Sequence, residues 1–346
     1  MLNLLTSHFG NGGALSEDQV ERAVEGLVDP GIEAVEKAAF LAALAAKGET
    51  VEEIEAFARA LLRRALAVPL DRATREEEIL DVCGTGGDRL NTFNISTAVA
   101  LVAAAAGLRV AKHGNRAITS KSGSADVLEA LGIRIDWTPE EAGRVLGEHG
   151  FVFLFAPNYH PAFKHIGPAR RLCAERGQRT IFNFLGPLLN PARPSAQLVG
   201  VPRPELCEPL AQVLKSLGLR RGMVVCGQVG ALHLDELSTL GDSTIAEFYQ
   251  DRGFAVSLFS PGAFPLQPAV LADLAGGEKA DNAAIVTRVL NGEDRGPKRD
   301  AVLLNAAAAL FVGGQARSIA EGWDRASQLI DSGQAIAKLD ALRGAR

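Results

Sequence analysis

The hydrophobic residues of the first seventy positions recur at the three- and four-residue spacing of amphipathic helices. Ser16 precedes one such stretch, and Thr50 precedes another and is followed by Glu53 at the spacing of a capping box. A further helix is expected over residues 32–46, ending before Gly48. The pattern therefore predicts a small, all-helical domain over residues 1–70.

From residue 79 onward, short apolar runs alternate with helical stretches. The runs that predict strands are residues 79–83, 109–112, 133–135, 151–155, 197–201 and 223–226. Helices are expected to begin at Ser96, at Ser124 and after Thr138. A Pro- and Gly-rich stretch at residues 260–268 is expected to join an edge strand to C-terminal helices. Such alternation is typical of an α/β domain with a mostly parallel sheet covered by helices.

The composition narrows the class of protein. A length of 346 residues is enough for two domains, and 47% hydrophobic with 22% charged residues supports a sizeable buried core. Aromatic residues are only 5%, so the core must consist mainly of Ala, Leu, Val and Ile. The net charge of −5 argues against a general nucleic-acid or membrane-surface binder, which would need a basic excess.

The cysteines and the apolar runs bear on cellular location. The four cysteines lack CxxC spacing, so we expect free, reduced thiols in a cytoplasmic protein. The N-terminal residues lack the basic start and long apolar stretch of a signal peptide. The longest apolar run, residues 98–107, is far shorter than the ~20 residues that span a bilayer. We therefore expect neither a signal peptide nor a transmembrane helix.

A glycine-rich segment, GTGGD at residues 84–88, directly follows the strand predicted at residues 79–83. Glycines let the backbone approach a ligand closely and direct several N–H groups at it. The next segment, NTFNIST at residues 91–97, opens a helix, so its amides and hydroxyls lie at a positive helix end. The spacing matches neither a dinucleotide fingerprint nor a Walker loop. We interpret the two segments as an anion site rather than an ordinary strand–helix turn.

Two further segments follow strand ends. Residues 112–116, KHGNR, and the serine-rich residues 119–124 come after the second predicted strand, where Lys112 can supply a charge to phosphate. Asp235 and Glu236 follow the strand predicted at residues 223–226, and adjacent carboxylates suit Mg²⁺. An Asp-Glu pair alone is a weak motif, and it gains weight from the phosphate loops.

Together these segments resemble the anthranilate phosphoribosyltransferases, and the resemblance runs nearly end to end. The matching segments are residues 84–88, 92–97, 112–116, 122–126, 156–162, 179–183, 186–187, 234–238 and 303–309. The resemblance implies the nucleoside phosphorylase/phosphoribosyltransferase-type fold. It divides the chain into a helical domain at residues 1–70, completed near 162–185, and an α/β domain that binds phosphoribosyl pyrophosphate at residues 75–160 and 186–346.

The resemblance also implies the reaction and the partners. The enzyme would transfer the phosphoribosyl group of 5-phosphoribosyl 1-pyrophosphate to the amine of anthranilate in tryptophan biosynthesis. Mg²⁺ would be the cofactor, the active site would lie between the domains, and a homodimer would form through the helical domain. No nucleic acid and no membrane would be partners.

Site residues follow from the resemblance position by position. Those expected to bind phosphoribosyl pyrophosphate are Gly84, Gly87, Asp88, Thr92, Asn94, Ile95, Ser96, Thr97, Lys112, His113, Gly114, Asn115, Arg116, Ser120 and Ser124. Those expected to hold Mg²⁺ are Ser96, Asp235 and Glu236. Those expected to contact anthranilate are Gly84, Asn115 and Arg170, with Arg170 facing its carboxylate.

No residue is assigned as a catalytic acid or base. We expect a dissociative displacement at the anomeric carbon in which positioning and electrostatics dominate, since a neutral aryl amine is already nucleophilic. The sequence departs from the family at Arg89, where glycine is usual, and at residues 172–178, which form a longer segment. The sequence leaves open how both affect acceptor choice.

Two other functions fit parts of the sequence. A pyrimidine nucleoside phosphorylase shares the fold and a glycine-rich phosphate loop, but phosphorolysis needs no metal on a pyrophosphate, so Asp235 and Glu236 argue against it. A non-enzymatic paralogue that binds nucleic acid across a basic dimer groove would be favoured by a positive net charge and by loss of the acidic pair. This chain has the opposite features.

Overall fold

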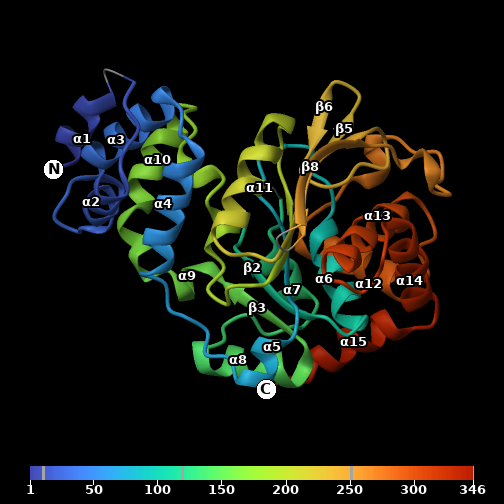
Figure 1. The fold of residues 1–346 in the computed structure, drawn as a ribbon. Coiled ribbons are helices and arrows are strands. Elements are labelled where there is room, and N and C mark those ends of the chain that lie inside the picture. Colours follow the sequence, from blue (N-terminus) through green and yellow to red (C-terminus); the bar gives the residue numbers. More distant parts are fainter. Residues whose placement is uncertain (10–11, 118–120, 250–251, 346) are drawn as a thin grey trace. The chain divides into compact units, whose positions relative to one another are not determined.

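The structure, a computed structural model, describes residues 1–9, 12–117, 121–249 and 252–345 (Figure 1). The chain divides into two compact units. One consists of Met1–Ala67 and Pro157–Pro191, and the other of Val68–Ala156 and Ala192–Arg346. The segment expected near residues 162–185 lies within the first unit.

Helices build the first unit. They are α1 (Leu2–His8), α2 (Glu17–Val28), α3 (Ala34–Lys47), α4 (Val51–Leu62) and α10 (Gly167–Glu175), with α9 (Ala156–Tyr159) at the boundary and the short 3-10 helices η2 (Pro161–His165), η3 (Ile181–Asn183) and η4 (Gly186–Leu189). Helix α3 packs against α1 and α10, and α2 packs against α4. The chain thus returns after the strand β3 (Phe151–Phe155) to complete a helical bundle.

Capping boxes begin two of these helices where the sequence predicts them. The Ser16 hydroxyl accepts a hydrogen bond from the Gln19 N–H, and the Gln19 side chain accepts one from the Ser16 N–H. Thr50 and Glu53 form the same reciprocal pair at α4. The pattern did not predict α1, because its seven residues present only Leu2 and Leu5 to the core.

A sheet with helices around it forms the second unit. Within the described residues, eight strands make one sheet in the order β3-β2-β1-β4-β5-β7-β8, with β6 paired to β5. The strands are β1 (Ile79–Gly84), β2 (Arg109–Gly114), β3 (Phe151–Phe155), β4 (Ala196–Gly200), β5 (Arg221–Val229), β6 (Leu232–Leu234), β7 (Ser243–Tyr249) and β8 (Arg252–Phe259). The first five strands of this order are parallel, and β6, β7 and β8 join antiparallel. The predicted mostly parallel sheet is confirmed.

Nine α-helices are described in this unit. They are α5 (Arg72–Glu76), α6 (Ile95–Ala105), α7 (Ser124–Ala130), α8 (Pro139–His149), α11 (Cys207–Ser216), α12 (Lys279–Leu290), α13 (Pro297–Val312), α14 (Ile319–Asp331) and α15 (Gln334–Arg343), with the short 3-10 helices η5 (Pro204–Leu206), η6 (Pro261–Ala263) and η7 (Leu271–Leu274). Helix α6 packs against β1, α13 and α15, and α11 covers β5 and β7. Figure 1 shows α12, α13 and α14 grouped beside α6.

The core of this unit is built mainly from small and aliphatic residues. The alanines of α6 and α13 are almost all fully buried, and they let the two helices approach closely. The core cluster includes few aromatic side chains, as the composition predicts. The four cysteines are buried free thiols. Within the described residues, no helix is long and apolar enough to cross a membrane.

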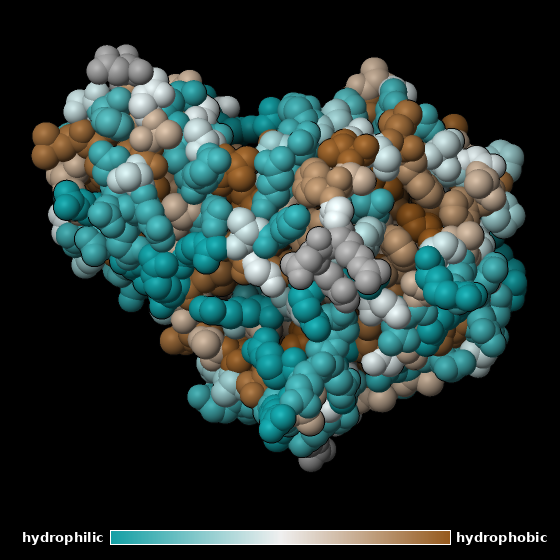
Figure 2. Space-filling model, in the orientation of Figure 1, coloured by the Kyte–Doolittle hydropathy of each residue, from teal (hydrophilic) through white to brown (hydrophobic). Residues whose placement is uncertain are grey.

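Two parts of the sheet differ from the prediction. Residues 133–135 were predicted as a strand, but they form an irregular connection between α7 and α8. Ile133 and Ile135 are each 5% exposed. The apolar run therefore indicates burial, but these residues do not pair in the sheet. The edge strand expected before residue 260 is β8, yet the pattern gave bounds for neither β8 nor β7. The exposed Val256 and Leu258 of β8 hide any alternation of apolar and polar positions. Figure 2 shows hydrophobic surface in the region of β5, β6 and β8.

Candidate functional site

The parallel strands place their carboxyl ends along one edge of the sheet. The chain adds β2 and β3 on one side of β1 and then adds β4 and β5 on the other. Between β1 and β4 the direction of strand addition therefore reverses, and open α/β sheets bind ligands beyond the strand ends at such a point. The glycine-rich segment leaves β1 here, at Gly84.

The glycines have two separate reasons for their positions. A Cβ atom on Gly84 would lie 2.3 Å from Oδ2 of Asp235, and one on Gly200 would lie 1.5 Å from the Asp235 carbonyl oxygen. Both positions therefore require glycine so that the acidic loop can approach the strand ends. Gly86 and Gly87 instead have φ values of 69° and 91°, and a Cβ on either would meet no atom within 4 Å. These two keep the loop open and in a conformation that favours glycine.

The acidic pair joins the glycine loop to helix α6. Oδ2 of Asp235 accepts a hydrogen bond from the Gly86 N–H at 2.8 Å. Oε1 of Glu236 accepts one from the Ser96 N–H at 3.1 Å, in the first turn of α6. The structure thus brings the three residues predicted to hold Mg²⁺ to one place, although they are about 140 positions apart in the sequence.

The electrostatics of this place favour a cation. Burial, and then the nearby Asp88 carboxylate, raise the pKa of Asp235 to about 7. Burial and the Asp235 carboxylate raise the pKa of Glu236, while Lys112 acts in the opposite direction. Within the described residues, no group of three or more His, Cys, Asp and Glu side chains is arranged to hold a metal by itself. Two carboxylates and a hydroxyl still fit Mg²⁺, which takes its other ligands from water and substrate phosphates.

Helix α6 directs its N-terminus at the same place. It begins at Ile95, and the first-turn N–H groups make the surroundings positive. The Thr97 hydroxyl is buried and has no hydrogen-bond partner among the described residues. Polar atoms at a positive helix end, with one hydroxyl left without a protein partner, are what an anionic ligand requires.

Side chains join strands β1 and β2 just below this site. The backbone register of the two strands is Ile79 with Arg109 and Leu80 with Val110, whereas β1 is in register with β4 as far as Gly84. The two strands remain in contact beyond that register. The Lys112 ammonium donates to the Val82 carbonyl oxygen at 2.5 Å and to the Ser96 hydroxyl at 3.3 Å.

Asp81 joins the same two strands from the β1 side. Its carboxylate accepts hydrogen bonds from the His113 N–H and from the Gln197 side chain, each at 3.3 Å. Asp81 and Lys112 are 0% and 2% exposed. Lys112, which is predicted from the sequence to bind the donor, therefore also joins β2 to β1. No role is predicted from the sequence for Asp81 or Gln197, because both lie within apolar strands.

The loop after β2 is compact. A Cβ on Gly114 would lie 2.4 Å from the Ser124 hydroxyl, so β2 and the start of α7 lie in close contact. The Ser124 hydroxyl donates to the Asn115 carbonyl oxygen at 3.4 Å. The Arg116 guanidinium pairs with the carboxylates of Asp126 and Glu129 at 2.9 and 2.6 Å. Its charge is thus already paired within the protein. Ser120, also expected to bind the donor, lies outside the described residues.

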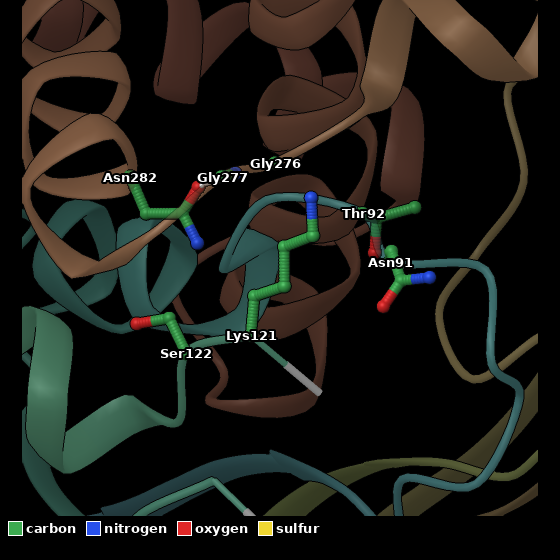
Figure 3. Close-up of a pocket in the computed structure, with 7 residues that line it drawn as sticks. All are labelled: Asn91, Thr92, Lys121, Ser122, Gly276, Gly277 and Asn282. Atoms are coloured by element: carbon green, nitrogen blue, oxygen red, sulfur yellow. Dashed lines mark hydrogen bonds between the residues drawn. The ribbon is translucent and has the colours of Figure 1, made fainter. Parts of the chain in front are cut away.

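A small pocket lies beside these loops (Figure 3). It is lined by Asn91, Thr92, Lys121, Ser122, Gly276, Gly277 and Asn282. Figure 3 shows Asn282 on the side of α12 and Lys121 on the loop opposite. Thr92 is predicted from the sequence to bind the donor, whereas Gly276, Gly277 and Asn282 are not. The signal that could have found them is a Gly-Gly pair directly before a helix with a buried amide, in a C-terminal region otherwise interpreted as packing.

Arg170 lies in the first unit, on α10. Burial lowers its pKa, and its guanidinium lies 5.4 Å from the centre of the Phe182 ring. Within the described part of the chain, no carboxylate forms an ion pair with Arg170. A partly buried guanidinium without an anionic partner is a suitable receptor for a carboxylate.

The chain matches one family in both units. Residues 76–336 match the family described as "Glycosyl transferase family, a/b domain", and residues 5–65 match "Glycosyl transferase family, helical bundle domain". The fold and the site therefore define a glycosyltransferase with a helical bundle and an α/β part.

Relatives narrow this further. The anthranilate phosphoribosyltransferase of Geobacter sp. (strain M21) is 47% identical over 339 residues, covering 95% of this chain and 94% of that protein. The structure of the enzyme from Thermus thermophilus matches with a TM-score of 0.87 at 40% identity and covers 98% of both chains. That of the Saccharomyces cerevisiae enzyme in complex with PRPP and Mg matches with a TM-score of 0.83 at 29% identity, covering 95% and 92%. The chain belongs to the anthranilate phosphoribosyltransferases, which confirms the resemblance.

Proposed function

We propose that this chain transfers the phosphoribosyl group of 5-phosphoribosyl 1-pyrophosphate (PRPP) to the amine of anthranilate. The products are N-(5-phosphoribosyl)anthranilate and pyrophosphate, and the reaction belongs to tryptophan biosynthesis. The family to which the chain belongs supports this reaction. The observation that carries it is the pair of hydrogen bonds that join Asp235 to Gly86 and Glu236 to Ser96. They bring acidic ligands for a cation to an open glycine loop and a helix N-terminus, which suits a metal-bound pyrophosphate.

The donor occupies the edge of the sheet beyond β1 and β2. The N–H groups of residues 84–88 and of the first turn of α6 face its phosphates, and the Lys112 ammonium adds positive charge. The other donor-binding residues remain those given by the resemblance: Gly84, Gly87, Asp88, Thr92, Asn94, Ile95, Thr97, His113, Gly114, Asn115, Arg116, Ser120 and Ser124. Of these, Arg116 has its guanidinium already paired with Asp126 and Glu129, and its N–H donates to Oδ1 of Asn115 at 2.7 Å.

Ser96, Asp235 and Glu236 hold Mg²⁺, which when bound supplies positive charge to the departing pyrophosphate. The structure of the yeast enzyme with PRPP and Mg supports this cofactor. The residues of this chain contribute to the reaction by their fixed positions around the substrate. The loop N–H groups stabilise the charge that develops on the leaving group, and the hydrogen bonds by which Lys112 and Asp81 join β1 to β2 keep those groups in place.

Anthranilate is recognised through its carboxylate by Arg170, with Gly84 and Asn115 as further contacts. The partly buried guanidinium of Arg170, without an ion-pair partner in the described residues, supports this assignment. Recognition of the carboxylate orients the amine toward the anomeric carbon. No side chain is assigned as a base, since the neutral aryl amine is itself the nucleophile.

A homodimer forms through the helical unit. Leu4 and Val35 are 77% and 63% exposed, and α1 packs against α3, so these apolar side chains lie on neighbouring helices. Figure 2 shows hydrophobic surface at α1. Light scattering on the Leu4→Glu/Val35→Glu variant should give the mass of a monomer, whereas a dimeric variant would place the interface elsewhere. The cytoplasm is the expected location, as four free thiols suit a reducing compartment.

The reaction is tested by following anthranilate fluorescence in the presence of PRPP and Mg²⁺. Fluorescence should fall only when protein, PRPP and Mg²⁺ are all present. A second reaction mixture contains a pyrimidine nucleoside and inorganic phosphate, and no free base should appear in it. Stable anthranilate fluorescence together with release of the base would instead identify a nucleoside phosphorylase.

A further inference from the structure

A buried asparagine on α12 contacts the segment at residues 91–97, which we call the donor motif, from a distant part of the sequence. Asn282 is 2% exposed, and its Nδ2 donates to Oδ1 of Asn94 at 2.8 Å. Oδ1 of Asn282 accepts a hydrogen bond from the Gly277 N–H at 2.8 Å. Nδ2 of Asn94 in turn donates to the Ser122 carbonyl oxygen at 3.3 Å. Three segments that line one pocket are thus linked through two side-chain amides. Figure 3 shows one of these amides, that of Asn282, in the pocket with Gly277 and Ser122.

Backbone groups at both ends fix the orientation of these amides. The Gly277 N–H is only a donor, so the Asn282 atom that faces it must be the oxygen. The Ser122 carbonyl oxygen is only an acceptor, so the Asn94 atom that faces it must be the nitrogen. The contact between Asn94 and Asn282 is then a correct donor–acceptor pair only in the observed arrangement. The orientation does not depend on a choice between amide oxygen and nitrogen.

The surrounding backbone is built to hold this arrangement. The Gly276 N–H donates to the Asn91 carbonyl oxygen at 2.9 Å, and Thr92 forms a β-bridge with Ala275. A Cβ on Gly276 would lie 2.8 Å from Cα of Phe93 and 2.8 Å from Oδ1 of Asn282. Glycine is therefore required for residues 274–277 to pass directly behind the donor motif.

One hydrogen of Asn94 stays available. Its Nδ2 carries two hydrogens, of which Ser122 takes one, and the described residues offer no acceptor for the other. The side chain is partly exposed, so this N–H can meet a phosphate or hydroxyl oxygen. Because Oδ1 of Asn94 accepts from Asn282, the amide is held with its oxygen toward Asn282 and its nitrogen turned away.

We propose that Asn282 is a positioning residue that acts through Asn94, holding its amide so that an N–H faces the phosphoribosyl donor. This inference rests on the proposed function, because it takes Asn94 to contact that donor. Asn282 itself does not touch the substrate. Its removal frees Oδ1 of Asn94, lets the amide rotate, and exposes an acceptor to the phosphate oxygens.

The test is a double-substitution cycle on donor binding, measured by calorimetric titration with PRPP and Mg²⁺. Asn282→Ala should weaken PRPP binding about tenfold, the usual cost of one lost buried hydrogen bond, and leave the KM for anthranilate unchanged. In the Asn94→Ala background, Asn282→Ala should change PRPP binding by less than about twofold, because the residue through which it acts is gone. Thr287→Val is the control on the same helix, since it removes only the bond to the Ala283 carbonyl oxygen, and should leave binding unchanged.

If the Asn282→Ala variant does not fold, Asn282→Asp replaces it in the measurement of PRPP binding. Its carboxylate still accepts from Gly277 but places a second acceptor against Oδ1 of Asn94, so PRPP binding should fall at least as much. Additive losses in the cycle, or unchanged PRPP binding in both Asn282 variants, overturn the inference while wild-type binding upholds the proposed function. Absence of PRPP binding in the wild type overturns the proposed function and the inference with it.

Discussion

The Lys112 ammonium on β2 donates to the Val82 carbonyl oxygen on β1 at 2.5 Å, beyond the residues whose backbones are in register. A buried charge thus joins the two strands directly below the loops that are proposed to receive the donor. Because the same ammonium also contacts Ser96 at 3.3 Å, one side chain links strand spacing, helix α6 and the cation site.

Removing this charge should affect the donor selectively. Lys112→Met keeps the length and apolar stem of the side chain but leaves the Val82 carbonyl oxygen without its partner. The free energy of unfolding should fall by about 1–3 kcal/mol, the cost of a buried unsatisfied group. PRPP affinity should fall with it, while the KM for anthranilate stays close to that of the wild type. Unchanged PRPP affinity would make Lys112 a spacer between strands only.

The donor loop allows a matched pair of glycine substitutions. Gly87 and Gly218 have φ values of 91° and 93°, both are exposed, and a Cβ on either meets nothing within 4 Å. Valine should therefore strain the backbone equally at the two positions. Gly87→Val should also abolish the rise in melting temperature that PRPP causes, because a side chain then occupies the pyrophosphate position. Gly218→Val should keep that rise. A full rise in the Gly87 variant would place the pyrophosphate elsewhere.

Arg170 should act on the acceptor alone. Arg170→Ala removes a charged hydrogen bond worth about 1.5–3 kcal/mol, so the KM for anthranilate should rise roughly tenfold to a hundredfold while that for PRPP changes little. Aniline, which lacks the carboxylate, should discriminate poorly between wild type and variant. The neighbouring Arg171 is exposed, and Arg171→Ala is the matched control. An equal rise in the KM for both substrates would mean that Arg170 stabilises the structure rather than recognises the acceptor.

Much of the fold could be predicted because its signals are local. The boxes at Ser16, Thr50 and Thr138 each lie within four residues, and each begins a helix as expected. Strand β8 gave no such signal, since its place at the sheet edge leaves apolar and polar residues equally exposed. The strand predicted at residues 133–135 was wrong because a buried connection and a paired strand can both have a short apolar run.

The site residues also differ in whether their signal in the sequence is local. The glycine loop, the helix start and the acidic pair could be named from short motifs and the resemblance that they carry. Asn282 could not, because its partner Asn94 is 188 positions away and nothing near it in the sequence refers to a ligand. Arg89, where the resemblance expects glycine, has a φ of 61°, so the backbone there adopts the conformation that glycine favours. No contact in the structure explains why arginine is present.

The stability of the helical unit should depend on pH through His160. Burial lowers the pKa of this side chain from 6.5 to about 4, and it is 3% exposed. Between these values the unfolded chain binds more protons, so the free energy of unfolding falls as the pH drops from about 6.5 to about 4 and is fully retained above that window. The loss reaches about 3 kcal/mol at most. Urea titrations of His160→Gln should show a shallower dependence than the wild type between pH 7 and 4.5, and parallel curves would contradict the assignment.

Asp235 and Glu236 are proposed to bind a cation that accompanies PRPP during transfer to anthranilate. The most direct measurement compares the wild type with Asp235→Asn/Glu236→Gln, which keeps side-chain volume and removes both charges. One pyrophosphate should be released for each anthranilate consumed by the wild type, with a saturable dependence on Mg²⁺. The variant should remain folded, lose that Mg²⁺ dependence and turn over at least about a hundredfold more slowly, as expected for loss of metal-ion charge stabilisation. A folded variant with near wild-type, Mg²⁺-dependent turnover would show that these two carboxylates do not bind the cation.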